Sequence, residues 1–274
     1  MSKIAAVQMA SGPNVNANLT EAGRLIAMAA AAGAQLVVLP ENFAIMGMSE
    51  IDKVNIREQD GQGPIQDFLA EQSIKHGVWL VGGTVPLVAS DSDKVRGSCL
   101  LINDKGERVA RYDKIHLFDV HLPESGENYN ESETIEKGSD VVVVDTPFGK
   151  LGLAVCYDLR FPELFRKMVD LGVQIITLPS AFTAMTGRAH WKVLLRARAI
   201  ENLCYVVASA QGGYHVSGRE TFGNSMIVNP WGVVIDRLSN GSGFVIADID
   251  LNYLESTRRN FPVLDHRKMQ CSGI

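Results

Sequence analysis

Short apolar runs alternate with amphipathic segments along the first part of the chain. Residues 4–9 and 35–39 are apolar and short enough to be buried strands. Residues 18–32 lie between them, carry apolar side chains at helical spacing and are followed by a glycine, so we expect a helix packed on a sheet. Strand, helix and strand in this order predict a crossover unit with parallel strands. Pro40 ends the second strand and places Glu41 at its carboxyl end.

The remaining elements follow from the same periodicities and from turn residues. Turn sequences at 103–106 and 147–150 predict two hairpins. Residues 117–139 show little periodicity, and because so long a loop is unusual inside a compact domain, we expect it to wall a pocket. We expect further strands at 78–81, 99–102, 108–112, 141–144, 151–155, 173–178, 205–210, 225–228, 233–236 and 244–248, and helices at 64–76, 162–171 and 190–201.

Residues 30–41 and 169–180 repeat one pattern, in which a helix end, Gly, any residue, Gln, an apolar strand and Pro follow one another. Two similar halves, each a sheet covered by helices, stack most simply sheet against sheet, which predicts an α/β fold of four layers, an α-β-β-α sandwich. No linker separates the halves, so we expect a single domain over residues 1–274. The tail from about residue 260 lacks periodicity, and we expect it to pack at the interface of a homodimer or larger homo-oligomer.

Composition and charge narrow the class of partner. Of 274 residues, 46% are hydrophobic and 21% are charged, as in an ordinary globular protein. The net charge of -5 is spread without a basic patch, so we expect a small-molecule partner, with no nucleic acid and no membrane. The start of the chain lacks a signal-peptide core, and no apolar run approaches the ~20 residues of a membrane helix, which predicts a cytoplasmic protein. The histidines are scattered, and we expect neither a metal nor a cofactor.

Four cysteines lie far apart along the chain, which favours reduced thiols. Cys99 and Cys204 sit inside strand-like runs and are interpreted as inert core residues, and Cys271 has no informative context. Cys156 closes a predicted strand, precedes a helix start and has Arg160 a turn away, features that favour a thiolate. On these local features alone, an inert buried thiol explains Cys156 equally well.

Three motifs taken together carry more information than any single residue. Alone, Glu41 would be a helix cap or a solvated carboxylate, Lys114 a surface charge and Glu131 a loop acid. Together the motifs resemble, in order and spacing, the Glu, Lys and Cys motifs of the nitrilase superfamily of carbon-nitrogen hydrolases. They are Leu39-Pro40-Glu41, Tyr112-Asp113-Lys114-Ile115-His116-Leu117-Phe118 and Gly152-Leu153-Ala154-Val155-Cys156-Tyr157-Asp158-Leu159-Arg160-Phe161-Pro162-Glu163. The resemblance covers nearly the whole chain and implies the α-β-β-α sandwich, usually assembled as dimers or larger oligomers.

The resemblance also implies a mechanism. Cys156 would attack an amide carbonyl and form a thioester, while Glu41 accepts the thiol proton, passes it to the leaving amine and later activates water. Lys114 and the backbone N–H of Tyr157 would stabilise the negative carbonyl oxygen.

The family has a second glutamate near the site. The stretch Tyr129-Asn130-Glu131-Ser132 resembles the motif of that residue and implies that Glu131 holds Lys114. Glu124 and Glu127, in the same region, then remain loop acids.

Within the superfamily the chain is most similar to the Nit1-type branch, through stretches that include residues 179–182, 194–201 and 229–232. This similarity implies an amidase that hydrolyses an α-keto acid amide, deaminated glutathione, to 2-oxoglutarate and cysteinylglycine. Omega-amidases, which act on 2-oxoglutaramate or 2-oxosuccinamate, share most of these motifs and are the alternative. A non-catalytic scaffold is an alternative of a different class.

An α-keto acid substrate requires a cation near its carboxylate. Arg160 is the natural candidate, because its guanidinium fork can hold a carboxylate at two points, with Thr186 as a hydroxyl partner. The other interpretation is that Arg160 pairs with Asp158 or Glu163 and is purely structural.

Aromatic residues and departures from the branch pattern complete the expected substrate site. Phe182 and Tyr157 would supply apolar wall or belong to the core. The sequence departs from the branch at Ala184, Met185 and Arg188, so we expect these residues near the substrate mouth.

Overall fold

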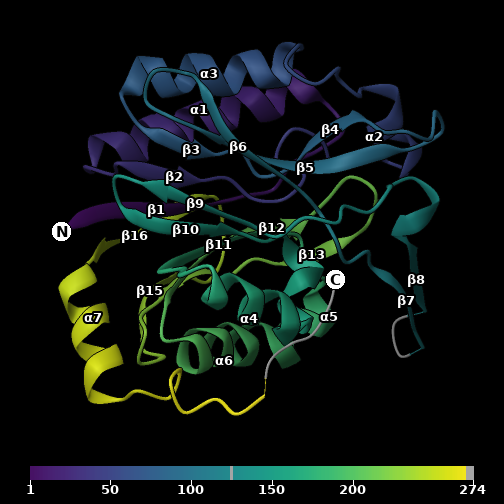
Figure 1. The fold of residues 1–274 in the computed structure, drawn as a ribbon. Helices are drawn as coiled ribbons and strands as arrows, with labels where there is room; N and C mark the ends of the chain where they lie inside the picture. The colour runs from purple at the N-terminus through teal and green to yellow at the C-terminus, as the bar shows by residue number, and fades with distance from the viewer. Residues whose placement is uncertain (124–125, 270–274) are drawn as a thin grey trace.

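Two β-sheets lie face to face in the middle of the molecule, and helices cover the outer face of each (Figure 1). The structure is a computed structural model that describes residues 1–123 and 126–269, so Glu124 and Cys271 lie outside the described residues. The sheets are joined where the ends of two parallel strands meet, with Gln8 opposite Ala210. The predicted four-layer α-β-β-α sandwich is confirmed.

The first half of the chain supplies most of one sheet. Its strands are β4 (Val85–Val88), β6 (Arg108–Asp113), β5 (Val95–Ile102), β3 (Trp79–Val81), β2 (Leu36–Val38) and β1 (Ser2–Met9), with β16 (Gly243–Ile249) at the far edge, and the covering helices are α1 (Val15–Ala31) and α3 (Pro64–His76). Along β1, Ile4 faces the second sheet and Ala5 faces the helices, and both are fully buried. Burial on both faces explains why this strand is a continuous apolar run rather than an alternating one.

The second half repeats this arrangement. Its strands are β9 (Val142–Thr146), β10 (Gly149–Leu153), β11 (Ile175–Ser180), β12 (Tyr205–Tyr214), β14 (Ser225–Val228) and β15 (Val234–Leu238), with β13 (Glu220–Phe222) paired to the end of β12, and the covering helices are α4 (Pro162–Asp170) and α6 (Lys192–Asn202). The two copies of the repeated sequence pattern become α1 with β2 and α4 with β11. Each repeated strand lies directly beside β1 or β12, the strands that join the sheets.

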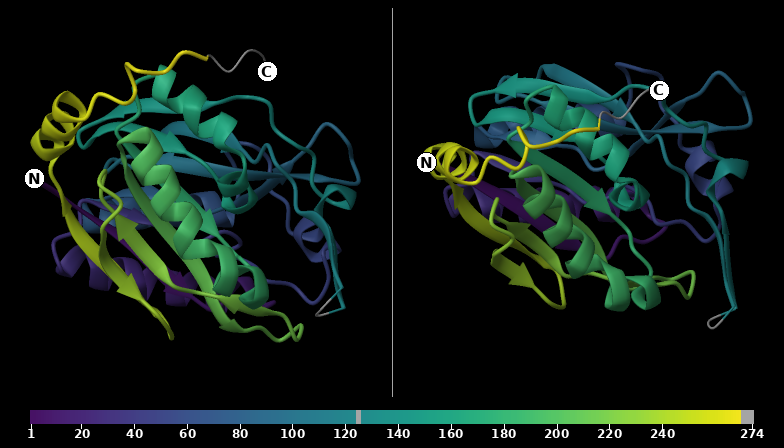
Figure 2. Two further views of the ribbon diagram at one scale, coloured as in Figure 1. Left: turned by 90° about the horizontal axis from the view of Figure 1, so that it is seen from below. Right: turned by 60° about the horizontal axis from the view of Figure 1, so that its bottom comes forward.

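The region 117–139 is not one irregular loop. It contains the hairpin of β7 (Asp119–Leu122) and β8 (Glu127–Asn130), followed by the short 3-10 turn η1 (Glu131–Glu133). Figure 2 shows this hairpin extending away from the sandwich. Because neither strand has a buried face, the sequence carries no apolar alternation that could predict it.

Several further elements were not predicted. They are α2 (Ile51–Asn55), α5 (Ala184–Thr186), the π-helical turn η3 (Gly187–Trp191) and α7 (Leu251–Asn260), as well as β4 and β13. Helix α7 begins at Asp250, whose side chain accepts hydrogen bonds from the N–H groups of Asn252 and Tyr253. Of its residues only Leu254 and Thr257 are buried, too few to form a readable stripe.

The described part of the tail packs on its own chain. Phe261 stacks edge-on against Trp231 at 5.5 Å, and Arg267 forms an ion pair with Asp170 of α4. Within residues 1–123 and 126–269, no helix combines the length and apolar character needed to cross a membrane. Cys99 and Cys204 are fully buried free thiols, as predicted.

Candidate active site

The structure brings all eight residues proposed from the sequence to one pocket of about 350 Å³. The four expected at the reaction centre come from chain positions far apart: one follows β2, one follows β6, one opens η1 and one opens the 3-10 turn η2 (Cys156–Arg160). The eight pocket residues are Glu41, Lys114, Glu131, Cys156, Tyr157, Arg160, Phe182 and Thr186. The expectation that residues 117–139 form a wall of the pocket is confirmed, because four of them besides Glu131 line it: Phe118, Asn128, Tyr129 and Asn130.

Cys156 sits at a sharp reversal of the chain. Strand β10 ends at Leu153, Val155 is still extended, and Cys156 then adopts the left-handed conformation with φ of 48°. A non-glycine residue in this region costs about 1–3 kcal/mol and persists only where the surroundings impose it. The turn thus holds the thiol at the floor of the pocket, with only 8% of the residue exposed.

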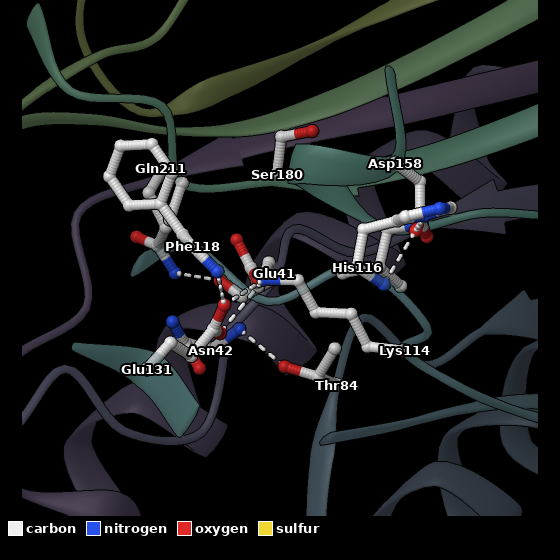
Figure 3. A network of polar contacts seen from close by, with 12 residues as sticks. Glu41, Asn42, Thr84, Lys114, His116, Phe118, Glu131, Asp158, Ser180 and Gln211 are labelled. Carbon is white, nitrogen blue, oxygen red and sulfur yellow. Dashed lines mark hydrogen bonds and ion pairs between the residues drawn. The ribbon is translucent and has the colours of Figure 1, made fainter. Parts of the chain in front are cut away.

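Asp158 imposes that turn. Its backbone N–H donates to the Val155 carbonyl at 3.0 Å, and its Oδ2 accepts from the Val155 N–H at 2.8 Å. The same carboxylate accepts from the Tyr112 hydroxyl at 2.6 Å and lies 2.7 Å from Nδ1 of His116 (Figure 3). Asp158 therefore ties the nucleophile turn of the second half to β6 of the first, and the interpretation that it pairs with Arg160 is wrong.

Lys114 lies between two carboxylates (Figure 3). Its Nζ is 2.8 Å from Oε1 of Glu41 and 2.8 Å from both oxygens of Glu131, and Glu131 also accepts from the Phe118 N–H at 2.7 Å. Burial alone would lower the pKa of Lys114, but the charges of Glu131 and Glu41 outweigh it and raise that pKa well above its ordinary value. Lys114 is therefore a fixed cation, although only 2% of the residue is exposed.

Glu41 and Cys156 interact in the pocket, and their pKa values shift in opposite directions. Burial, followed by the charge of Glu41, raises the pKa of the Cys156 thiol well above its usual value. Burial also opposes ionisation of Glu41, but Lys114 and the bond from Cys156 outweigh it and lower the pKa of Glu41. The resting pair is thus a thiol beside a carboxylate, not the thiolate that the local sequence features favoured. That expectation fails because burial and the charge of Glu41 raise the pKa of the thiol by more than the charge of Lys114 lowers it.

The backbone around Glu41 is held from both halves. Asn42 adopts φ of 57° and donates its N–H to Oγ1 of Thr84 at 2.8 Å, and Gln211 of β12 donates from Nε2 to the Glu41 carbonyl at 3.1 Å (Figure 3). Sequence reasoning assigned no role to Gln211 and considered Asp158 only as a partner of Arg160. Gln211 could have been noticed as a polar residue after a long apolar run, and both side chains are fully buried and hydrogen-bonded in the structure.

Arg160 faces the pocket and is stacked rather than paired. Its guanidinium carbon lies 5.3 Å from the Phe182 ring centre and 5.7 Å from that of Tyr157, and Nη1 is 3.2 Å from Nδ1 of His190. It forms no ion pair with Asp158 or Glu163, both of which the structure describes. Arg160 thus remains available to an anionic ligand.

The pocket mouth differs in part from the expectation. Ala184, Met185 and Arg188 are not among the lining residues, and Arg188 is exposed on η3, because the chain turns away from the pocket after Thr186. Glu50, Lys53 and Arg219 line the mouth instead and had not been identified from the sequence.

Two other observations concern residues that could have added an acid or a metal ion to the site. Glu127 of β8 accepts a hydrogen bond from the Tyr129 hydroxyl at 3.0 Å and is not among the pocket residues. Over the described ranges, no group of three or more His, Cys, Asp or Glu side chains is arranged to hold a metal ion.

Comparisons with known proteins agree with this geometry. A family model for carbon-nitrogen hydrolases matches residues 3–259. A deaminated glutathione amidase from Synechocystis sp. is 43% identical over 266 residues, which cover 96% of this chain and 97% of the relative. The structure of the C. elegans NitFhit protein has a TM-score of 0.88 at 36% identity and covers 100% of this chain and 68% of that one. A mutant of the amidase from Nesterenkonia sp., solved after Michael addition of acrylamide at its active site cysteine, has a TM-score of 0.77 at 25% identity and covers 96% of this chain and 99% of that one. The chain therefore belongs to the carbon-nitrogen hydrolase family, whose members hydrolyse carbon-nitrogen bonds.

Proposed function

We propose that this hydrolase is an amidase that cleaves deaminated glutathione to 2-oxoglutarate and cysteinylglycine through a thioester on Cys156. The observation that carries the proposal is the geometry of one pocket, which holds the thiol of Cys156, the carboxylate of Glu41 at 2.8 Å from the Lys114 ammonium, and a guanidinium, that of Arg160, with no ion-pair partner among the described residues. The name of the Synechocystis relative supports the choice of substrate.

In the first half-reaction, the Cys156 sulfur attacks the amide carbon as its proton moves to Glu41 along their hydrogen bond. The C–N bond then breaks, Glu41 returns that proton to the leaving nitrogen, and cysteinylglycine departs. A thiol beside a carboxylate suits this step, because the base is already ionised and in contact with the proton that it must remove.

The carbonyl oxygen gains negative charge in both half-reactions. Lys114 and the N–H of Tyr157 would hold it, each donor contributing about 3–4 kcal/mol to transition-state stabilisation in comparable sites. Glu131 would keep Lys114 in place with its two 2.8 Å contacts, so that the cation does not move towards solvent.

In the second half-reaction, Glu41 takes a proton from a water molecule that attacks the thioester carbonyl. The C–S bond breaks, the sulfur takes that proton back from Glu41, and 2-oxoglutarate leaves as the free acid. One carboxylate thus acts as base and then as acid in each half-reaction.

The keto-acid end of the substrate would lie against Arg160. A guanidinium stacked on Phe182 and Tyr157 is fixed in direction and still presents its N–H groups to a carboxylate. Thr186 lies at the same pocket, where its Oγ1 is 2.8 Å from Oγ1 of Thr183 and can serve as a second polar partner.

The test is turnover and covalent trapping. Cys156→Ala should leave a folded protein that releases no 2-oxoglutarate from deaminated glutathione, whereas Cys204→Ala, which removes a buried thiol away from the pocket, should retain turnover. Intact-mass measurement during turnover should detect an acyl adduct on the wild-type enzyme and not on Cys156→Ala. Faster turnover of 2-oxoglutaramate would favour the omega-amidase alternative, and a chain that forms no adduct would be a scaffold.

The quaternary structure and location remain proposals. We propose one domain that assembles as a homodimer or larger homo-oligomer in the cytoplasm. Exposed apolar side chains on α6 and on the neighbouring turn support self-association: Val193, Ile200, Trp231 and Val233 are each more than two-fifths exposed, and Arg196 bonds the turn to the helix. Light scattering that gives the mass of one chain would contradict the oligomer.

A further inference from the structure

Every charged residue that lines the pocket, except two, has an oppositely charged partner. Lys114 is held by Glu41 and Glu131, and Lys53 lies 2.7 Å from Glu50. The guanidinium groups of Arg160 and Arg219 also line the pocket, and neither has a carboxylate at ion-pair distance among the residues that the structure describes. The pocket thus presents two unpaired cations, while the proposed chemistry has so far used only Arg160.

Arg219 is held rigidly although it has no anionic partner. It follows the reversal between β12 and β13, donates from Nη2 to the Ala181 carbonyl at 2.7 Å, and lies 5.0 Å from the centre of the Tyr129 ring. Its Nε is buried and makes no hydrogen bond within the described part of the chain. Nε is closed off from the pocket, but Arg219 as a whole is only partly buried and lines the pocket, so its guanidinium can offer a fixed positive charge to an anion that the protein itself does not supply.

One residue, Ala181, connects Arg219 to the nucleophile Cys156. Ala181 makes a backbone hydrogen bond to the thiol of Cys156 and accepts the bond from Arg219 with its carbonyl. Arg160 stacks on the next residue, Phe182, so the two arginines contact consecutive residues and line the same pocket as Cys156. The pocket therefore offers a substrate two separate guanidinium groups, one for an anion on its acyl part and one for an anion on its amine part.

We propose that Arg219 binds a carboxylate on the leaving amine, so that the enzyme selects α-keto acid amides in which both products carry a carboxylate. This inference rests on the proposed function. Cysteinylglycine is a dipeptide, which spans at most about 7 Å, so its terminal carboxylate stays close enough to the scissile bond to contact a side chain that lines the pocket. An omega-amidase substrate loses ammonia, which carries no carboxylate, and would leave Arg219 without a ligand.

The first experiment uses the wild-type enzyme. Release of 2-oxoglutarate is measured from deaminated glutathione and from the same compound with its glycine carboxylate converted to an amide. Loss of a charge-assisted pair should lower kcat/KM for the amide form by about 10- to 100-fold. Equal kcat/KM for the two compounds would overturn the inference while leaving the proposed function intact.

Variants then assign the effect to a residue. Arg219→Gln removes the charge while keeping a polar side chain, so it should lower kcat/KM about 10- to 100-fold on the acid and leave turnover of the amide form nearly unchanged. Arg219→Lys should recover part of the loss on the acid. Arg188→Gln, an equal charge change on exposed η3, should change neither.

The outcomes separate the two proposals. If Arg219→Gln slows both compounds equally, Arg219 only holds the Ala181 segment and the inference is overturned. If it slows neither, another group binds the leaving carboxylate and the inference is again overturned. If the wild-type enzyme releases no 2-oxoglutarate from either compound, the proposed function itself fails, and the selection of dicarboxylates fails with it.

Discussion

The two halves of the sandwich follow the same backbone route and end in different chemistry. In the first half, β2 ends at Val38, Leu39 and Pro40 lead on to Glu41, and Asn42 then turns the chain with φ of 57°. At the matching place in the second half, Pro179 and Ser180 remain inside β11, and Ser180 pairs with Ala210 of β12. The repeated pattern places a strand before Pro in both halves, but the strand ends earlier in the first half, and the residue that follows Pro is a carboxylate only there.

The difference shows how the site divides its work between the sheets. The first half supplies the charges, Glu41 and Lys114, and the second half supplies the thiol of Cys156 and the backbone of Ala181. Two buried hydrogen bonds hold the parts in register, one from the Tyr112 hydroxyl to the Asp158 carboxylate and one from Gln211 to the Glu41 carbonyl. A base and its nucleophile on separate sheets can each be held rigidly, because neither depends on the turn that carries the other.

The largest loss of activity is expected for Glu41→Gln, which removes the base that the first half supplies. The variant keeps the shape of the side chain and removes the base, so kcat/KM for deaminated glutathione should fall by about 10²- to 10⁴-fold. Steady-state release of 2-oxoglutarate measures the loss. The rate of acyl-adduct formation on Cys156, followed by intact mass, should fall in parallel, because the thiol proton has no acceptor.

Glu58→Gln is the matched control for that variant. Glu58 is another buried carboxylate of the first half, and it accepts from the N–H of Ile65 at 2.6 Å at the start of α3. Its replacement should lower the melting temperature without a comparable loss of turnover. If both variants lose turnover equally, buried charge in the first half matters for folding, and Glu41 has no special part in the chemistry.

A smaller effect is expected where the two halves are joined, at Asp158→Asn. The new amide can replace only one carboxylate oxygen, so either Tyr112 or His116 faces a donor instead of an acceptor. Breaking such a buried charged contact should lower the free energy of unfolding by about 2–4 kcal/mol. Turnover should fall by roughly 10-fold, because a shift of the Cys156 turn spoils its alignment with the substrate carbonyl.

Denaturant unfolding and turnover are measured on the same preparation. Asp248→Asn, at the exposed position of β16, is the control and should alter neither quantity. Full turnover in a destabilised Asp158→Asn would show that the φ of 48° at Cys156 does not depend on this carboxylate.

The sequence predicted the parts of the fold in which local pattern and tertiary burial agree. Helix α3 was predicted with its observed bounds, since Pro64 begins it and Gly77 ends it in the left-handed conformation. The hairpin β7–β8 was missed because it extends into solvent, where no apolar period marks a strand. Helix α7 was missed because it buries only two side chains.

Some features of the site could likewise be predicted from the sequence, and others could not. Glu41, Lys114, Glu131 and Cys156 could be placed from their motifs, and the structure brings them into one pocket. The protonation state of the thiol could not be predicted from the sequence. Burial and the charge of Glu41, which raise the pKa of the thiol, arise only in the tertiary structure and outweigh the local features around Cys156 that favour a thiolate. Arg219 was missed for a related reason: nothing near it in sequence shows that it reaches Ala181 and Tyr129.

The smallest effect is expected at Ser180→Ala, the position that matches Glu41 in the second half. Ser180, labelled in Figure 3, is fully buried, and its hydroxyl makes one long bond of 3.3 Å to the Leu178 carbonyl in its own strand. Because that bond joins no charged group and no other element, its loss should cost about 1 kcal/mol of stability or less. Turnover of deaminated glutathione should stay within about twofold of wild type, a difference of less than about 0.5 kcal/mol in the barrier. A loss approaching that of Glu41→Gln would mean that both strand ends act on the substrate, and the division of charge to one sheet and nucleophile to the other would be wrong.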